Sequence, residues 1–70
     1  LVDIEEEIKR LEEELKVTES EIMRSTKLLS NQGFVAKAPK ALIDKETTKK
    51  ADYEQKRDKL ISQLAALKNN

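Results

Sequence analysis

Lysine and arginine side chains gather in the middle of this 70-residue chain, and their chemistry is that of phosphate binding. From Ile22 to Lys50 there are seven basic residues against the acids Asp44 and Glu46, a net charge of +5, whereas the remainder carries −5. No acid occurs between Ile22 and Ile43. Lysine and arginine displace condensed counterions at each phosphate they approach, so we predict that nucleic acid binds this stretch and is repelled by the acidic ends. The candidate phosphate contacts are Arg24, Lys27, Lys37, Lys40, Lys45 and Lys49.

The composition argues against catalysis and metal binding. Cysteine and histidine are both absent, which removes thiolate nucleophiles, the usual zinc ligands and the commonest general base near neutral pH. The acidic runs 5–7 and 12–14 resemble a metal or acid–base site only superficially. Consecutive residues of a helix point about 100° apart and cannot converge on one ion, so we expect a solvated helix face. We predict no catalytic residue and no metal site.

Length and hydropathy limit the setting in which the chain works. Seventy residues form one domain at most, with a thin buried seam instead of a globular core. No apolar run approaches the roughly 18 to 20 residues that span a bilayer, and no signal-peptide pattern is present. We therefore expect a soluble, cytoplasmic protein with no membrane partner. Because the chain begins at Leu1, without methionine and already in heptad register, we expect it to be a fragment of a longer protein.

Two helical arms must position the basic residues, because apolar residues recur with alternating spacings of three and four on both sides of the middle. The first seam is Leu1, Ile4, Ile8, Leu11, Leu15, Thr18, Ile22, Ser25 and Leu29, and the second is Ile43, Glu46, Lys50, Tyr53, Arg57, Leu60, Leu64 and Leu67. We predict an all-α fold, an antiparallel two-helix coiled-coil hairpin that forms a single arm over residues 1–70. Its expected parts are a helix over about 1–32, a turn over about 33–38 and a helix over about 39–68.

The two seams fit one register, in which facing residue numbers sum to 71 or 72. Leu11 then faces Leu60 and Ile8 faces Leu64, which predicts an aliphatic zipper where the termini meet. Further along, Ser25 and Thr18 face Glu46, Lys50 and Tyr53, so the half near the turn has a mixed seam. Apolar burial supplies most of the favourable energy, and we therefore expect this distal half to be the less stable one.

The turn holds the only glycine, the only proline and the only phenylalanine. Gly33 in a left-handed conformation after the first helix would bring Leu29 and Phe34 into the hydrophobic contact of a Schellman termination. Pro39 suits the first position of the second helix, with Ala38 as a weak N-cap. Two readings of Phe34 and Val35 stay open: packing over the end of the seam, or contact with a partner.

The amino-acid sequence of the turn identifies a protein family more specifically than the heptad spacing does. The segment 29–39, in particular Asn31-Gln32-Gly33-Phe34-Val35-Ala36-Lys37-Ala38-Pro39, lies between an arm opening Val2-Asp3-Ile4-Glu5 and one containing Lys45-Glu46 and Ala51-Asp52-Tyr53-Glu54. Over essentially its whole length the chain closely resembles the C-terminal coiled-coil arm of bacterial valyl-tRNA synthetase. It departs from that pattern at Lys50 and Arg57, where leucine is more typical, and at Thr47-Thr48, where charged residues are usual.

The resemblance implies a non-catalytic, tRNA-binding helical hairpin of a class I aminoacyl-tRNA synthetase, a valine-tRNA ligase of protein biosynthesis. It implies contact with the outer corner of tRNA, where the D and T loops meet, in support of valyl-tRNA aminoacylation by the parent enzyme. Expected partners are tRNA, by resemblance tRNA-Val, and the rest of the synthetase chain. The fragment itself would need no cofactor, since ATP and Mg belong to the parent's other domains. Phe34 joins the basic residues as a tRNA-binding candidate, since Phe34 or Val35 would lie on an exposed base surface at this corner of the tRNA.

Two other functions remain open from the sequence. The chain could serve as a structural or protein-interaction hairpin, and its thin seam leaves self-association of the isolated fragment open. It also has the outline of the nucleic-acid-binding C-terminal hairpin of an ATP-binding-cassette translation factor, although that family's turn lacks the Lys37-Ala38-Pro39 phrase.

Overall fold

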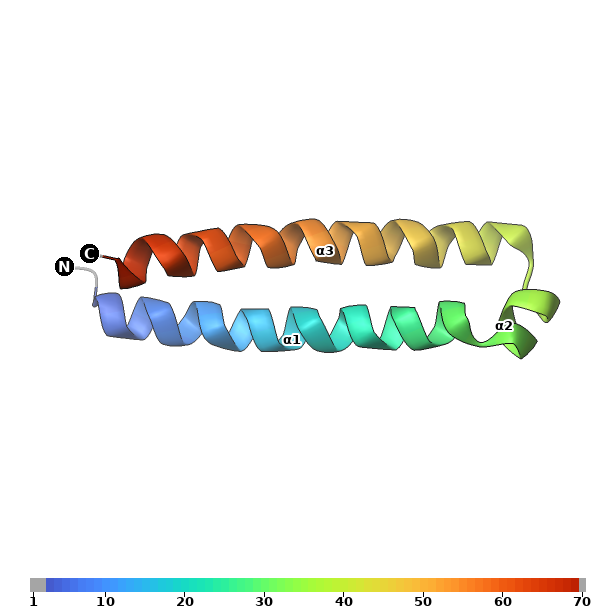
Figure 1. Ribbon diagram of the computed structural model, residues 1–70, viewed down its shortest axis with the longest axis horizontal. Helices are drawn as coiled ribbons and strands as arrows, with labels where there is room; N and C mark the ends of the chain where they lie inside the picture. The colour runs from blue at the N-terminus through green and yellow to red at the C-terminus, as the bar shows by residue number, and fades with distance from the viewer. Residues whose placement is uncertain (1–2, 70) are drawn as a thin grey trace.

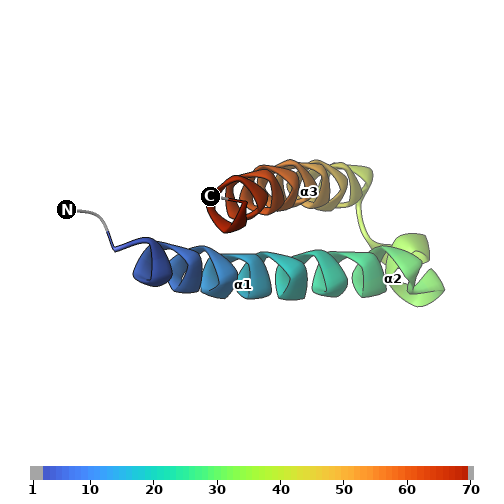
Figure 2. The same cartoon turned by 60° about the vertical axis from the view of Figure 1, so that its left-hand side comes forward.

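Two long antiparallel helices joined at one end make up the protein in this computed structural model, which describes residues 3–69 (Figure 1). Helix α1 spans Ile4–Ser30, the short α2 spans Gln32–Lys37, and α3 spans Lys40–Lys68. The rod measures 52 × 17 × 14 Å along its principal axes. Figures 1 and 2 both show α1 alongside α3, with α2 at one end of the rod, here called the tip, and the described chain ends toward the other. The predicted all-α hairpin is confirmed.

Helix α1 begins at a well-formed cap. The Asp3 carboxylate accepts hydrogen bonds from the backbone N–H of Glu5, at 3.0 Å, and of Glu6, at 3.4 Å. A negative charge at this end also interacts favourably with the helix dipole. The first helix was expected to start at residue 1, and residues 1 and 2 lie outside the described part of the chain.

The segment predicted as a turn over residues 33–38 is mostly helical. Asn31 has an extended backbone, with φ −79° and ψ 107°, and it ends α1 after Ser30. Its side-chain oxygen accepts from the backbone N–H of Gly33, at 3.0 Å, and of Phe34, at 3.3 Å, so the same residue caps α2. Asparagine competes in this way for backbone groups and favours a helix start over continuation.

The predicted Schellman termination at Gly33 is therefore wrong. Gly33 lies inside α2, and no glycine of the described residues has a positive φ. Glycine instead leaves room for the Asn31 cap, because a Cβ at position 33 would lie only 3.3 Å from the capping oxygen of Asn31. The first helix ends at Ser30, not near residue 32, since the asparagine cap acts before the glycine is reached.

Helix α3 starts one residue later than predicted, with Pro39 as its N-cap instead of its first residue. The Pro39 carbonyl accepts from the N–H of Leu42, at 3.0 Å, and of Ile43, at 3.2 Å. No side chain caps this helix, as the sequence led us to expect for a weak start.

The half of the rod near the chain ends has an aliphatic core. Leu11, Leu60 and Leu64 are buried, with Leu11 only 3% exposed, and the partly buried Ile8, Leu15 and Leu67 pack against them. The predicted zipper is confirmed for these six residues. It loosens at its outer end, where Ile4 is 46% exposed. The first predicted seam residue, Leu1, falls outside the described residues.

The distal half has a polar seam, also as predicted. Thr18 and Ser25 are the most deeply buried residues there, each 2% exposed. The Thr18 hydroxyl donates to the Glu14 carbonyl oxygen at 2.7 Å, so its burial leaves no unpaired donor. From α3 the seam receives half-buried Glu46, Lys50, Tyr53 and Arg57. One Glu46 carboxylate oxygen is buried without a hydrogen-bond partner, which makes this half energetically costly.

Candidate nucleic-acid interface

The hairpin carries the predicted contact residues to its distal end, from three helices. Arg24 and Lys27 lie in the last turns of α1, and Lys37 is the last residue of α2. Lys40 begins α3, and Lys45 and Lys49 follow within its next turns. Five of these six are exposed, and Lys49 is half-buried in a groove on α3. Basic charge therefore surrounds the tip.

The apolar residues of α2 divide between the two readings left open by the sequence. Phe34 is partly buried, whereas Val35 is 40% exposed. Phe34 thus has a packing role at the end of the rod, with only part of its ring available to a partner. Val35 offers the more accessible apolar surface at the tip.

The lysines of the tip are not neutralised by neighbouring acids. Among residues 3–69, none of the five predicted lysines has its amine within 4.0 Å of a carboxylate oxygen. Arg24 approaches Glu21 only at 3.9 Å, and its side chain is 75% exposed. An exposed cation without an internal partner keeps its full charge for a bound phosphate.

Ion pairs instead gather in the half near the chain ends. Arg10 bonds Glu7 and lies 3.7 Å from Glu14, and Lys68 reaches across from α3 to Glu12 at 3.2 Å. The hydrogen bond from Arg10 lowers the pKa of the Glu7 carboxyl, and the same contact raises the pKa of Arg10. In the distal half Arg57 pairs with Asp58 at 3.2 Å and Arg24 approaches Glu21, so the difference between the halves lies in the lysines, which are unpaired there among residues 3–69.

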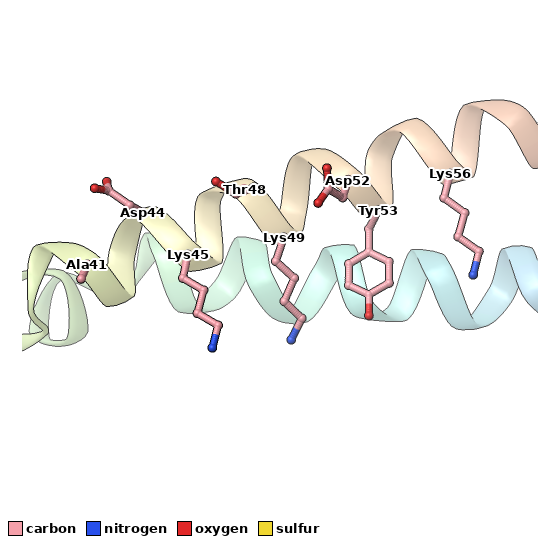
Figure 3. Close-up of a pocket in the computed structure, with 8 residues that line it drawn as sticks. All are labelled: Ala41, Asp44, Lys45, Thr48, Lys49, Asp52, Tyr53 and Lys56. Atoms are coloured by element: carbon pink, nitrogen blue, oxygen red, sulfur yellow. The ribbon is translucent and has the colours of Figure 1, made fainter.

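The basic residues line separate shallow grooves on different sides of the rod. Lys45 and Lys49 line one groove on α3 together with Tyr53 and Lys56 (Figure 3). Arg24 and Lys27 line another on the outer side of α1, with Met23 and Leu28. The structure therefore brings the predicted residues together in pairs, with Lys37 and Lys40 between the pairs at the turn.

Two residues of the α3 groove, Tyr53 and Lys56, were not among the predicted contacts. Tyr53 was assigned to the seam only, and Lys56 lies outside the basic stretch that defined the candidates. The signal that could have found them is spacing, because Lys45, Lys49, Tyr53 and Lys56 are separated by four, four and three residues. Such positions fall on one side of a helix.

Two further features concern only residues 3–69. None of their helices is long and apolar enough to cross a membrane. Within the same range, no three or more acidic side chains come together in a way that would hold a metal ion.

Comparisons with known proteins agree with this geometry. The family model described as the valyl tRNA synthetase tRNA binding arm matches residues 3–68. Valine–tRNA ligases of Oceanobacillus iheyensis, Geobacillus stearothermophilus and Bacillus subtilis are 47%, 48% and 44% identical over 68 residues, which is 97% of this chain. The chain spans only 8% of the length of each of these relatives. No solved structure gives a significant match.

Proposed function

Because this chain belongs to the valyl tRNA synthetase tRNA binding arm family, we propose that it is the arm of a valine–tRNA ligase and that its tip contacts the outer corner of tRNA. The D and T loops meet at this corner. The contact residues are those around the turn: Arg24, Lys27, Phe34, Lys37, Lys40, Lys45 and Lys49.

One observation carries the proposal: lysines without acidic partners among residues 3–69 surround one end of a rod whose other end is ion-paired and acidic. Phosphate contacts of this kind fix the position and orientation of a nucleic acid without reading much sequence. A folded RNA is recognised largely through its shape and backbone, which suits a narrow probe that meets the tRNA end-on.

The rest of the ligase supplies the chemistry in this proposal. The arm adds binding energy and orientation, in support of aminoacylation of tRNA-Val, while ATP and Mg are used by other domains of the parent chain. We infer that it acts in the cytoplasm and that its protein partner is the remainder of the synthetase.

Charge reversal at the tip tests the proposal. Lys37→Glu with Lys40→Glu should weaken binding of a tRNA-Val transcript by about tenfold or more at moderate salt, because two attractive contacts become repulsive. The magnitude of the slope of log K against log salt should also fall by roughly 1.4 to 1.8, since each of the two phosphate contacts contributes about 0.7 to 0.9. The matched control is Lys9→Glu with Lys16→Glu, two exposed lysines of the acidic half, which should leave affinity and slope nearly unchanged.

The competing function is a structural hairpin that pairs with a second copy of itself. The exposed apolar side chains Val17, Met23 and Ile61 favour it, since they are available on the outer surfaces of the rod. Sedimentation with and without tRNA separates the two. A stable dimer that is indifferent to tRNA, or a tip variant with unchanged binding, would reject the tRNA-binding proposal.

A further inference from the structure

A stripe of three lysines and one tyrosine runs along α3, away from the tip. Figure 3 shows Lys45, Lys49, Tyr53 and Lys56 extending side by side from α3 across α1, whereas the Asp44 and Asp52 carboxylates point the other way. All four line one groove, whose other lining residues are Ala41, Thr48 and these two aspartates. We call these four residues the shaft stripe.

Tyr53 occupies a special place in the stripe. It is half-buried, since one side of its ring belongs to the seam and shares a second groove with Val17 and Thr18 of α1. Its other side lines the lysine groove. The ring is therefore held firmly by packing and still presents aromatic surface to whatever enters the groove, flanked by Lys49 and Lys56.

The charges of the shaft stripe are available to a ligand. Among residues 3–69, the amines of Lys45, Lys49 and Lys56 have no carboxylate oxygen within 4.0 Å. Three acids of α1 face this side of the stripe: Glu14 and Glu21 lie 3.7 Å and 3.9 Å from arginines of their own helix, whereas Glu13 has no ion pair within residues 3–69. These pairs reduce the repulsion that a phosphate would meet on that side of the groove.

We propose that the shaft stripe binds an unpaired stretch of RNA, with a base stacked on Tyr53 and the neighbouring phosphates held by Lys45, Lys49 and Lys56. This inference rests on the proposed function and extends it, because it adds a second contact, away from the tip, that is made to a base. Proteins that bind unpaired strands combine a basic groove along the backbone with aromatic side chains on which bases stack. Lys49 and Lys56 flank Tyr53 by about 6 Å and 4.5 Å of helix rise, so phosphates on both sides of one base are within reach of their long side chains.

RNA suits the stripe better than an acidic protein segment does. Lysines alone would satisfy an acidic peptide, and the aromatic surface would then have no use. The stripe begins at Lys45, five residues after Lys40 of the tip, so one RNA molecule is long enough to touch both.

The composition provides a direct probe of the stacking. Tyr53 is the only tyrosine and the chain has no tryptophan, so its intrinsic fluorescence comes from this one ring. Stacking on a base should quench that emission as a tRNA-Val transcript is added, with the same midpoint as binding followed by a label on the RNA. A free tyrosine derivative in the same titration corrects for light absorbed by RNA. Binding without quenching would overturn the proposal.

Substitutions give an independent test. Tyr53→Leu keeps an apolar side chain in the seam and removes the stacking surface, and we expect tRNA affinity to fall about five- to tenfold. Tyr53→Phe keeps the ring and should bind like the parent chain. A fully paired RNA duplex should bind both variants and the parent equally well.

A second variant covers the case in which Tyr53→Leu lowers the folding midpoint. Lys56→Gln leaves Tyr53 in place and changes the one stripe lysine that is not a proposed tip contact, and it should still weaken tRNA binding about threefold and reduce its salt dependence. Equal affinity of both shaft variants and the parent, while the tip variant Lys37→Glu with Lys40→Glu binds weakly, would overturn the shaft stripe alone. Failure of the parent chain to bind tRNA would instead reject the proposed function. Poly-glutamate that binds the groove as tightly as RNA, with Tyr53 dispensable, would identify an acidic partner and overturn the RNA proposal.

Discussion

The two halves of this hairpin share one heptad spacing but differ in the residues that fill the seam and cover the surface. Near the chain ends, Leu11, Leu60 and Leu64 form a buried aliphatic core, and ion pairs cover the surface. Toward the tip, small polar residues fill the seam, and a Glu46 oxygen is buried unpaired. Lysines without acidic partners lie on the outside of this distal half.

The difference shows how stability and binding divide along a rod that has little core. A surface that binds an anion must keep its lysines free of acidic partners. Within the described chain, the lysines of the distal half therefore lack the stabilising ion pairs that basic residues near the chain ends make. Small seam residues such as Thr18 and Ser25 bury less apolar area than leucine does. The aliphatic half therefore holds the hairpin together, and the distal half presents the charges.

The largest expected effect comes from cutting the aliphatic core. Leu60→Ala removes a side chain that is almost fully buried, and should lower the free energy of unfolding by about 2 to 4 kcal/mol through lost burial and a residual cavity. Thermal unfolding followed by circular dichroism measures the change. Ile61→Ala, one position away on the exposed side, is the matched control and should cost well under 1 kcal/mol.

A corresponding truncation to alanine in the distal half compares the stability that each half contributes. Ile43→Ala truncates a half-buried seam residue and should cost less than Leu60→Ala. A larger loss at Ile43 than at Leu60 would show that the distal seam, not the aliphatic half, carries the stability.

A smaller effect of opposite sign should follow from making the distal seam apolar. Lys50→Leu with Arg57→Leu replaces two half-buried charged side chains by leucine and should stabilise the hairpin by about 1 to 2 kcal/mol. Amide hydrogen exchange should slow mainly in the distal parts of α1 and α3, because that is where local opening begins. Lys56→Leu with Lys59→Leu, two exposed positions on α3, is the control and should give little protection. Unchanged exchange near the tip in the first variant would contradict the idea that charge in the seam weakens this half.

Sequence spacing was sufficient to predict the hairpin because residues that recur every three or four positions can be buried together only on one face of a helix. It identified the buried Leu11 and the polar Thr18 alike, and the weak start of α3. It did not locate the end of α1, because Asn31 and Gly33 are both good helix terminators and the choice depends on which backbone groups their atoms reach.

The candidate site was predictable only in outline. Charge counting marks the basic stretch, and the fold then assigns its members to grooves on different sides of the rod. Tyr53 was placed in the seam by its spacing, which is correct for one side of its ring. The other side lines the lysine groove on α3, which the spacing of Lys45, Lys49, Tyr53 and Lys56 along that helix could have indicated. Its contribution to RNA binding, like that of the basic residues, stays a prediction.

The smallest expected effect lies at the opposite end, in the contact between Arg10 and Glu7. Because the hydrogen bond from Arg10 lowers the pKa of Glu7 in the folded chain below the ordinary value of 4.5, folding favours the ionised carboxylate. This contribution is therefore fully present above about pH 4.5 and is lost as the pH falls through the lowered value. Glu7→Gln should slightly flatten the dependence of the unfolding midpoint on pH between neutral and about pH 3, and Glu13→Gln is the control without an ion pair in residues 3–69. Equal slopes for Glu7→Gln and the parent would mean that this exposed pair adds nothing to the stability of this half.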